Sequence, residues 1–191
     1  MSAALTVGVL AVQGAFAEHC GALRRAGAEA REIRRPRELD GIDALILPGG
    51  ESTAQGRLMR ELGLFGPIAS MIGGGLPVFG TCAGMILLAK NIENDARSHF
   101  AAMDITVRRN GYGRQLASFT SHGRFSRHGN VEMVFIRAPY ITAAGPGVEI
   151  LAEIDGRAVA AREGRMLASA FHPEMTRDLR VLEYFLSMAR V

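Results

Sequence analysis

A five-residue motif with glycine at both ends, Gly80-Thr81-Cys82-Ala83-Gly84, constrains the fold of this chain more than any other feature. The apolar run at residues 76–79 before it predicts a buried strand, and the apolar helix formers after it predict a helix. A tight strand-to-helix turn around a nucleophile needs small residues on both sides, because bulkier side chains would collide there. Such a turn would hold Cys82 at a helix N-terminus, where the helix dipole favours a thiolate. The alternative is a buried structural cysteine.

Apolar runs separated by helical patterns predict a parallel α/β fold. Runs such as residues 5–12 and 44–47 are almost wholly apolar, which is typical of strands buried on both faces of a parallel sheet. The alternation of strand and helix predicts a doubly wound, mostly parallel sheet flanked by helices. Strands are expected at residues 5–12, 28–33, 44–47 and 76–79, and helices at residues 15–26, from about 53 to 62, and around 67–72.

The second half of the chain has a different pattern, which predicts additional antiparallel strands. Asp155-Gly156 is typical of a tight hairpin turn, the polar and basic residues 121–130 predict an exposed loop, and residues 177–189 predict a closing helix. We find no internal repeat or linker, so we expect a single domain over residues 1–191. The strand candidates are residues 105–109, 116–120, 132–137, 148–154, 158–162 and 166–171.

Three of the predicted parallel strands end in polar or glycine-rich loops. These loops are Gln13-Gly14, Gly49-Gly50-Glu51-Ser52 and the motif around Cys82. Open α/β sheets bind their ligands at the carboxyl ends of the strands. We therefore expect the three loops to meet at one edge of the sheet and to form a site there.

A histidine and an acid follow the last predicted strand, in Phe171-His172-Pro173-Glu174. His172 is placed to act as a base, and Glu174 can reach its other ring nitrogen and stabilise the imidazolium. Taken alone, this motif more often forms a cap or a surface loop. Together with Cys82 it completes a Cys–His–Glu triad for acyl transfer.

Acyl transfer also needs donors for a tetrahedral oxyanion, and the backbone N–H groups of Gly50 and Ala83 are the candidates. Without the triad, the Gly-Gly loop would be interpreted as an ordinary turn. The other histidines lack a carboxylate at a diagnostic spacing in the sequence: His19, His99, His122 and His128. No pattern typical of metal ligands is present, so no metal is expected.

The composition of the chain limits the partners and the cellular location that we expect for it. The formal net charge of +3 invites a nucleic-acid hypothesis, but the dense arginines at residues 24–37 are mixed with glutamates and carry no interleaved aromatics. We therefore expect no nucleic-acid partner. No apolar run reaches the length of a membrane span, the N-terminus does not resemble a signal peptide, and two cysteines make no disulfide framework. The expected location is the cytoplasm, without membrane contact.

The motifs together resemble the class I (triad) glutamine amidotransferases. Leu47-Pro48-Gly49-Gly50-Glu51-Ser52-Thr53, the Cys82 motif and Phe171-His172-Pro173-Glu174 carry this resemblance. It implies a flavodoxin-like, three-layer α/β fold. Three further segments are similar to the glutaminase subunits of pyridoxal 5'-phosphate synthase, namely residues 9–14, Arg109-Asn110-Gly111-Tyr112-Gly113-Arg114-Gln115 and Phe135-Ile136-Arg137-Ala138-Pro139.

The resemblance implies hydrolysis of L-glutamine to glutamate and ammonia, through a γ-glutamyl thioester on Cys82, with His172 as acid and base and Glu174 as its orienting partner. It also implies that glutamine is bound by Gly50, Glu51, Ser52, Arg109, Ile136 and Arg137. Ammonia would pass to a PdxS-type synthase subunit, with this chain as a peripheral subunit on a dodecameric core. Pyridoxal phosphate would be a product of that complex, so no cofactor is expected.

Some alternatives stay open. A guanidinium suits the α-carboxylate of glutamine, but the residues do not say which arginine supplies it. The chain could serve another synthase, such as imidazole glycerol phosphate synthase, or be a catalytically silent binding module of the same fold. Gln13-Gly14 and residues 109–115 oppose the first alternative, and the intact triad opposes the second. Gly111 and Thr120 depart from the family pattern without touching the triad.

Overall fold

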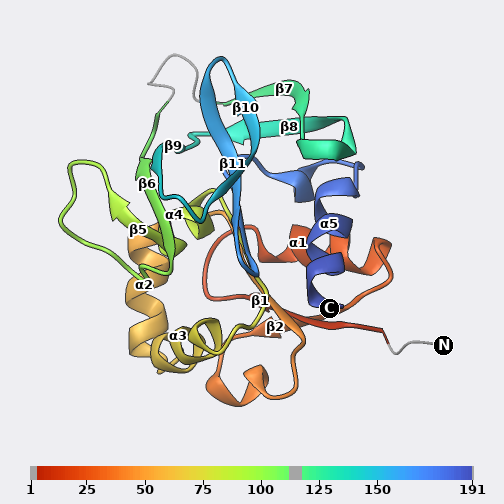
Figure 1. The fold of residues 1–191 in the computed structure, drawn as a ribbon. Coiled ribbons are helices and arrows are strands. Elements are labelled where there is room, and N and C mark those ends of the chain that lie inside the picture. Colours follow the sequence, from red (N-terminus) through yellow and green to blue (C-terminus); the bar gives the residue numbers. More distant parts are fainter. Residues whose placement is uncertain (1–3, 112–117, 191) are drawn as a thin grey trace.

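The structure, a computed structural model, describes residues 4–111 and 118–190 (Figure 1). These residues form a ten-stranded sheet in the order β2-β1-β3-β4-β12-β11-β9-β6-β5, with β10 pairing β11, and a separate ribbon of β7 and β8. The strands of the first half are β1 (Thr6–Leu10), β2 (Glu29–Ile33), β3 (Ala44–Leu47), β4 (Val78–Thr81) and β5 (Ala89–Ile92). Those of the second half are β6 (Met103–Arg108), β7 (Ser118–Arg124), β8 (Asn130–Ile136), β9 (Tyr140–Ala144), β10 (Glu149–Ile154), β11 (Arg157–Glu163) and β12 (Met166–Ser169).

Helices cover both sides of the parallel strands. In Figure 1, α1 and α5 lie together on one side, and α2 and α3 lie on the other. Among the described residues, no helix is both long and apolar enough to cross a membrane. The α-helices are α1 (Phe16–Arg25), α2 (Ser52–Glu61), α3 (Phe65–Gly73), α4 (Ala83–Leu88) and α5 (Arg180–Ala189), and the 3-10 turns are η1 (Pro36–Leu39), η2 (Ser126–His128) and η3 (Pro173–Met175).

The predicted doubly wound sheet is confirmed. Strands β2, β1, β3, β4 and β12 are all parallel, and the chain leaves β1 toward β2 on one side and β3 on the other. This reversal of direction is the point at which open α/β sheets bind ligands. The predicted antiparallel strands are also present, because β11 pairs antiparallel with β12, β9 and β10.

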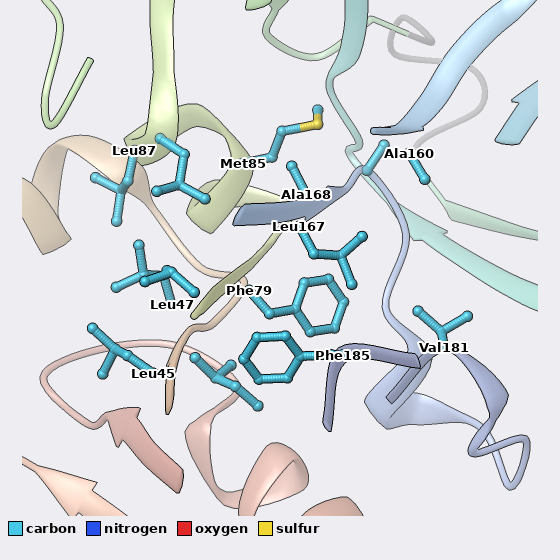
Figure 2. Close-up of a cluster of buried hydrophobic side chains, with 14 of the residues drawn as sticks. Leu45, Leu47, Phe79, Met85, Leu87, Ala160, Leu167, Ala168, Val181 and Phe185 are labelled. Atoms are coloured by element: carbon cyan, nitrogen blue, oxygen red, sulfur yellow. The ribbon is translucent and has the colours of Figure 1, made fainter. Parts of the chain in front are cut away.

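The core packs against both faces of β3 and β4. Phe79 of β4 faces Phe185 of α5 with ring centroids 5.4 Å apart, and Figure 2 shows Val181 and Leu167 on the same side. Leu45 and Leu47 alternate with the residue between them and so lie on the other face of the sheet, toward Leu87 of α4 (Figure 2). Because fully burying each such side chain contributes about 1.5–3 kcal/mol, these two layers fix the position of β4 in the middle of the sheet.

The structure corrects the expected loop at residues 121–130. Its first four residues belong to β7, which pairs with β8 in unbroken register from Ser118–Ile136 to Arg124–Asn130. The side chains of β7 are exposed or half-buried, so a polar sequence is compatible with a strand whose stability comes from the backbone ladder. The first two residues of the strand expected at 116–120 lie outside the described residues.

Two strands were not expected from the sequence. Strand β5 follows α4 directly. Its apolar residues continue the apolar pattern of α4, so the sequence does not indicate that the helix ends and a strand begins there. Strand β9 has only one buried residue, Ile141, which removes the alternation that would have indicated it. The closing helix begins at Arg180 rather than at residue 177, and Asp178 before it accepts a hydrogen bond from the Arg180 N–H at 3.1 Å.

The approach of α4 to β3 gives a stability prediction. A Cβ atom on Gly84 would lie 2.0 Å from the Leu47 carbonyl oxygen, so Gly84→Ala should lower the free energy of unfolding by about 3 kcal/mol. Gly21→Ala in the middle of α1 is the matched control, because the nearest atom there is the end of the Arg25 side chain at 3.8 Å. This control should raise stability by about 0.5–1 kcal/mol. Urea unfolding measures both, and equal stability of the two variants would contradict the tight packing.

Candidate active site

Cys82 lies in the predicted turn between β4 and α4. Its backbone has a φ of 50°, in the left-handed region that side chains rarely adopt, and its N–H donates to the Ser169 carbonyl of β12 at 2.7 Å. The thiol is 7% exposed and donates weakly to the Ile136 carbonyl oxygen at 3.8 Å. The strained turn is thus held by strands on two sides, which keeps the sulfur at the carboxyl edge of the sheet.

His172 and Glu174 follow β12, the strand next to β4. The His172 N–H donates to the Val134 carbonyl of β8 at 2.8 Å, and Pro173 begins the turn η3 that carries Glu174. His172 Nδ1 and Glu174 Oε1 are 2.7 Å apart, and both side chains are almost fully buried. The predicted histidine–acid pair is therefore formed.

The electrostatics of this pair favour a protonated imidazole and an ionised acid. Burial opposes the charge on His172, but its interactions with Cys82 and Glu174 outweigh that cost and raise the pKa of the imidazole. Burial likewise opposes ionisation of Glu174, yet the neighbouring His19 and the hydrogen bond with His172 hold the pKa of this carboxyl below its usual value. A protonated imidazole is the form that can give a proton to a leaving amine.

A cavity of about 350 Å³ opens beside Cys82 and His172. Glu174 does not line it and lies behind His172. The predicted site residues on its wall are Gly50, Glu51, Ser52, Cys82, Ala83, Arg109, Ile136, Arg137 and His172. Sequence reasoning did not assign a site role to five further lining residues, Ala15, Ile86, Asn110, Pro139 and Met175. Asn110 and Pro139 fall inside the two motifs that carry the narrower resemblance, so the motifs could have indicated them.

The loop after β3 passes directly over His172. A Cβ atom on Gly49 would lie 2.3 Å from Cε1 of the imidazole, so only glycine permits this approach. The Gly49 carbonyl accepts from the Ala15 N–H at 3.0 Å. Because N–H and C=O point in opposite directions across a trans peptide, the Gly50 N–H points away from Ala15. Gln13 fastens the same loop, since its Oε1 accepts from the Glu51 N–H at 2.9 Å.

Glu51 and Arg109 form a charged pair on the cavity wall, 3.0 Å apart. Glu51 also caps α2, because its carboxylate accepts from the N–H groups of Thr53 and Ala54. Arg109 has a second carboxylate nearby, that of Asp95, at 3.8 Å. The pair therefore offers opposite charges side by side at the cavity.

Two other predicted binding residues differ in their surroundings. The Ser52 hydroxyl is buried and has no hydrogen-bond partner within residues 4–111 and 118–190. Arg137 is exposed and has a φ of 45°, which turns the chain just after the Ile136 carbonyl that meets Cys82. Residues 112–115 of the motif that begins at Arg109 lie outside the described part of the chain.

His19 has a carboxylate neighbour in the fold that its spacing in the sequence does not indicate. His19 lacks a carboxylate at a diagnostic spacing, yet its Nε2 lies 3.4 Å from Glu174 Oε2 and 3.0 Å from the Thr81 hydroxyl. The contact arises because α1 packs beside η3 and β4, and 155 positions of sequence separate the two residues. Spacing along the chain carries no signal of such a contact.

Comparisons with known proteins agree with this geometry. Residues 9–190 match the SNO glutamine amidotransferase family. Subunit PdxT of pyridoxal 5'-phosphate synthase from Bifidobacterium longum is 52% identical over 188 residues, covering 95% of this chain and 99% of the relative. The same subunit from Pelotomaculum thermopropionicum is also 52% identical, covering 95% and 94%. A solved structure of a glutamine amidotransferase superposes with a TM-score of 0.92 at 45% identity, covering 97% of this chain and 99% of that one. The chain belongs to the SNO glutamine amidotransferase family.

Proposed function

We propose that this chain is the glutaminase subunit of a pyridoxal 5'-phosphate synthase, and that residues 1–191 act as one glutaminase domain. The observation that carries the proposal is the cavity in which Cys82 meets the His172–Glu174 pair, in a chain 52% identical to PdxT subunits. The substrate is L-glutamine, and the products are L-glutamate and ammonia.

In the first half of the reaction, the Cys82 thiol gives its proton to His172 Nε2, and the resulting thiolate attacks the side-chain amide carbon of glutamine. His172, protonated through the interactions that raise its pKa, gives its Nε2 proton to the leaving nitrogen. The C–N bond breaks, ammonia departs, and a γ-glutamyl thioester remains on Cys82. In the second half, neutral His172 takes a proton from water, the hydroxide displaces the sulfur, and glutamate leaves.

The oxyanion of each tetrahedral intermediate needs two donors close to Cys82. We assign these to the backbone N–H groups of Gly50 and Ala83, because both residues line the cavity that holds Cys82.

The charged pair on the wall suits the α-amino acid end of glutamine. Arg109 would hold the α-carboxylate and Glu51 the α-ammonium, since a zwitterion presents one charge of each sign. Ser52 brings an unpartnered buried hydroxyl to the cavity wall, as far as the described residues show, and Ile136 and Arg137 also line the cavity. The cavity would thus bind glutamine by both ends.

The ammonia would pass to a PdxS-type synthase subunit, with this chain as a peripheral subunit on a dodecameric core. The support is the identity to PdxT, which is a synthase subunit.

Substitution of the nucleophile tests the chemistry. In the presence of the synthase subunit, Cys82→Ala should lower glutamine hydrolysis by about 10⁴-fold or more while far-UV circular dichroism is unchanged. Cys20→Ala is the matched control and should keep activity near the wild-type rate, because Cys20 is buried in α1 away from the cavity. Substantial turnover by the Cys82 variant would rule out the nucleophile assignment.

A glutamine-analogue alkylator tests the same site without turnover. We expect it to label Cys82 and spare Cys20, because burial raises the pKa of the Cys20 thiol and keeps it protonated. Peptide mass spectrometry after brief exposure gives the ratio of the two adducts. Equal labelling would show that neither thiol is activated.

Reconstitution tests the partner. The chain is mixed with a PdxS-type subunit, glutamine, a pentose phosphate and a triose phosphate, and pyridoxal phosphate is followed by absorbance. The amount of pyridoxal phosphate should be well above that formed in a control without glutamine. With Cys82→Ala, the amount should fall to the level of this control. Hydrolysis of glutamine without pyridoxal phosphate would keep the glutaminase and reject this partner, and the imidazole glycerol phosphate synthase subunit would then be tested.

A further inference from the structure

A second buried histidine contacts the acid of the proposed triad from the side opposite His172. His19 comes from α1, Thr81 from the end of β4 and Glu174 from η3, and none of the three lines the cavity. His19 Nε2 is 3.0 Å from Thr81 Oγ1 and 3.4 Å from Glu174 Oε2. The three polar side chains therefore form a buried group directly behind His172.

Burial makes the second oxygen of Glu174 costly to leave without a donor. The side chain of Glu174 is 0% exposed, and His172 serves only Oε1. Within residues 4–111 and 118–190, Oε2 has no hydrogen-bond partner, and His19 Nε2, hydrogen-bonded to Thr81, is the donor that lies 3.4 Å from it. A buried carboxylate that lost this donor would be less stable in its ionised form.

The surroundings of His19 define where its proton lies. Both neighbours of Nε2 are oxygens, one from a hydroxyl and one from a carboxylate, so the N–H belongs on Nε2. The other tautomer would turn a lone pair toward the carboxylate.

His19 is also neutral. Burial lowers its pKa, Glu174 and Glu18 oppose that shift, and the nearby His172 adds to it. A neutral donor orients Glu174 without cancelling the negative charge that His172 needs. A lysine or arginine here would compete with His172 for that charge.

We propose that His19 is a positioning residue whose Nε2–H is shared between Thr81 Oγ1 and Glu174 Oε2, and that it keeps the carboxylate ionised and turned toward His172. The inference rests on the proposed glutaminase function, since the His172–Glu174 pair is its target. It adds the side chains of His19 and Thr81 to the proposed triad. Neither of them lines the cavity beside Cys82.

The test compares variants that remove or keep the donor, each assayed in complex with the synthase subunit. His19→Leu removes the N–H and should lower kcat for glutamine hydrolysis about 10–100-fold with little change in KM. The acid limb of the kcat/KM profile should move to higher pH, because Glu174 becomes easier to protonate. His19→Gln places an amide N–H near the position of Nε2 and should restore most of kcat and return the limb toward the wild-type position.

Thr81 provides a second pair of variants if His19→Leu does not fold. Thr81→Val removes the hydroxyl that holds His19 and should shift the acid limb in the same direction by a smaller amount, whereas Thr81→Ser keeps the hydroxyl and should not. Melting temperatures are measured for every variant, so that loss of fold is separated from loss of positioning.

The outcomes separate this inference from the function on which it rests. If wild-type protein hydrolyses glutamine and His19→Leu matches it in kcat and pH profile, His19 is only a packing residue and the proposal is overturned. The proposal is also overturned if Thr81→Val and Thr81→Ser have the same pH profile. If the wild-type complex hydrolyses no glutamine, the proposed function fails first. The pH dependence of Cys82 alkylation then still reports whether His19→Leu disturbs the His172–Glu174 pair, and an unchanged dependence rejects the inference.

Discussion

The contact between α4 and β3 at Gly84 is the constraint on which the site depends. Because Gly84 has no side chain, α4 lies against the Leu47 carbonyl, and the chain can reverse through Cys82 immediately after β4. Strand β4 runs between β3 and β12, so the loop after β3 and the histidine after β12 flank Cys82 on its two sides. Strand order alone thus brings together the proposed nucleophile, oxyanion loop and base from three distant segments.

A second constraint is the cost of burying an acid behind that base. Glu174 is held in an environment that disfavours its charge, and its contacts with His19 and His172 offset this cost. His172 is the charged partner and faces the cavity, whereas His19 is the neutral one and faces the core. The same burial that excludes water also strengthens the contact between Glu174 and His172, since electrostatic interactions weaken in water.

Much of this arrangement could be predicted from the sequence, because its signals are local. The glycines around Cys82 and the His172-Pro173-Glu174 turn each lie within a few residues, and the edge rule for parallel sheets joins them. His19 could not be predicted, because its contact with Glu174 depends on how α1 packs against η3. Strand β9 was not predicted, and the prediction for β7 ended too early. The side chains of both strands are mostly exposed or half-buried, so the sequence shows no apolar alternation there.

The residues of the proposed site come from two parts of the fold, the parallel strands and the antiparallel strands of the second half. The parallel strands supply Cys82, His172 and the Gly49–Gly50 peptide, so the bond-breaking groups are held by the most deeply buried part of the fold. The far wall of the cavity comes from segments at the ends of β6 and β8, which carry Arg109, Ile136 and Arg137. Arg109 and the Ile136–Arg137 pair therefore come from parts of the chain that are separate from the parallel strands and from the turn at Cys82.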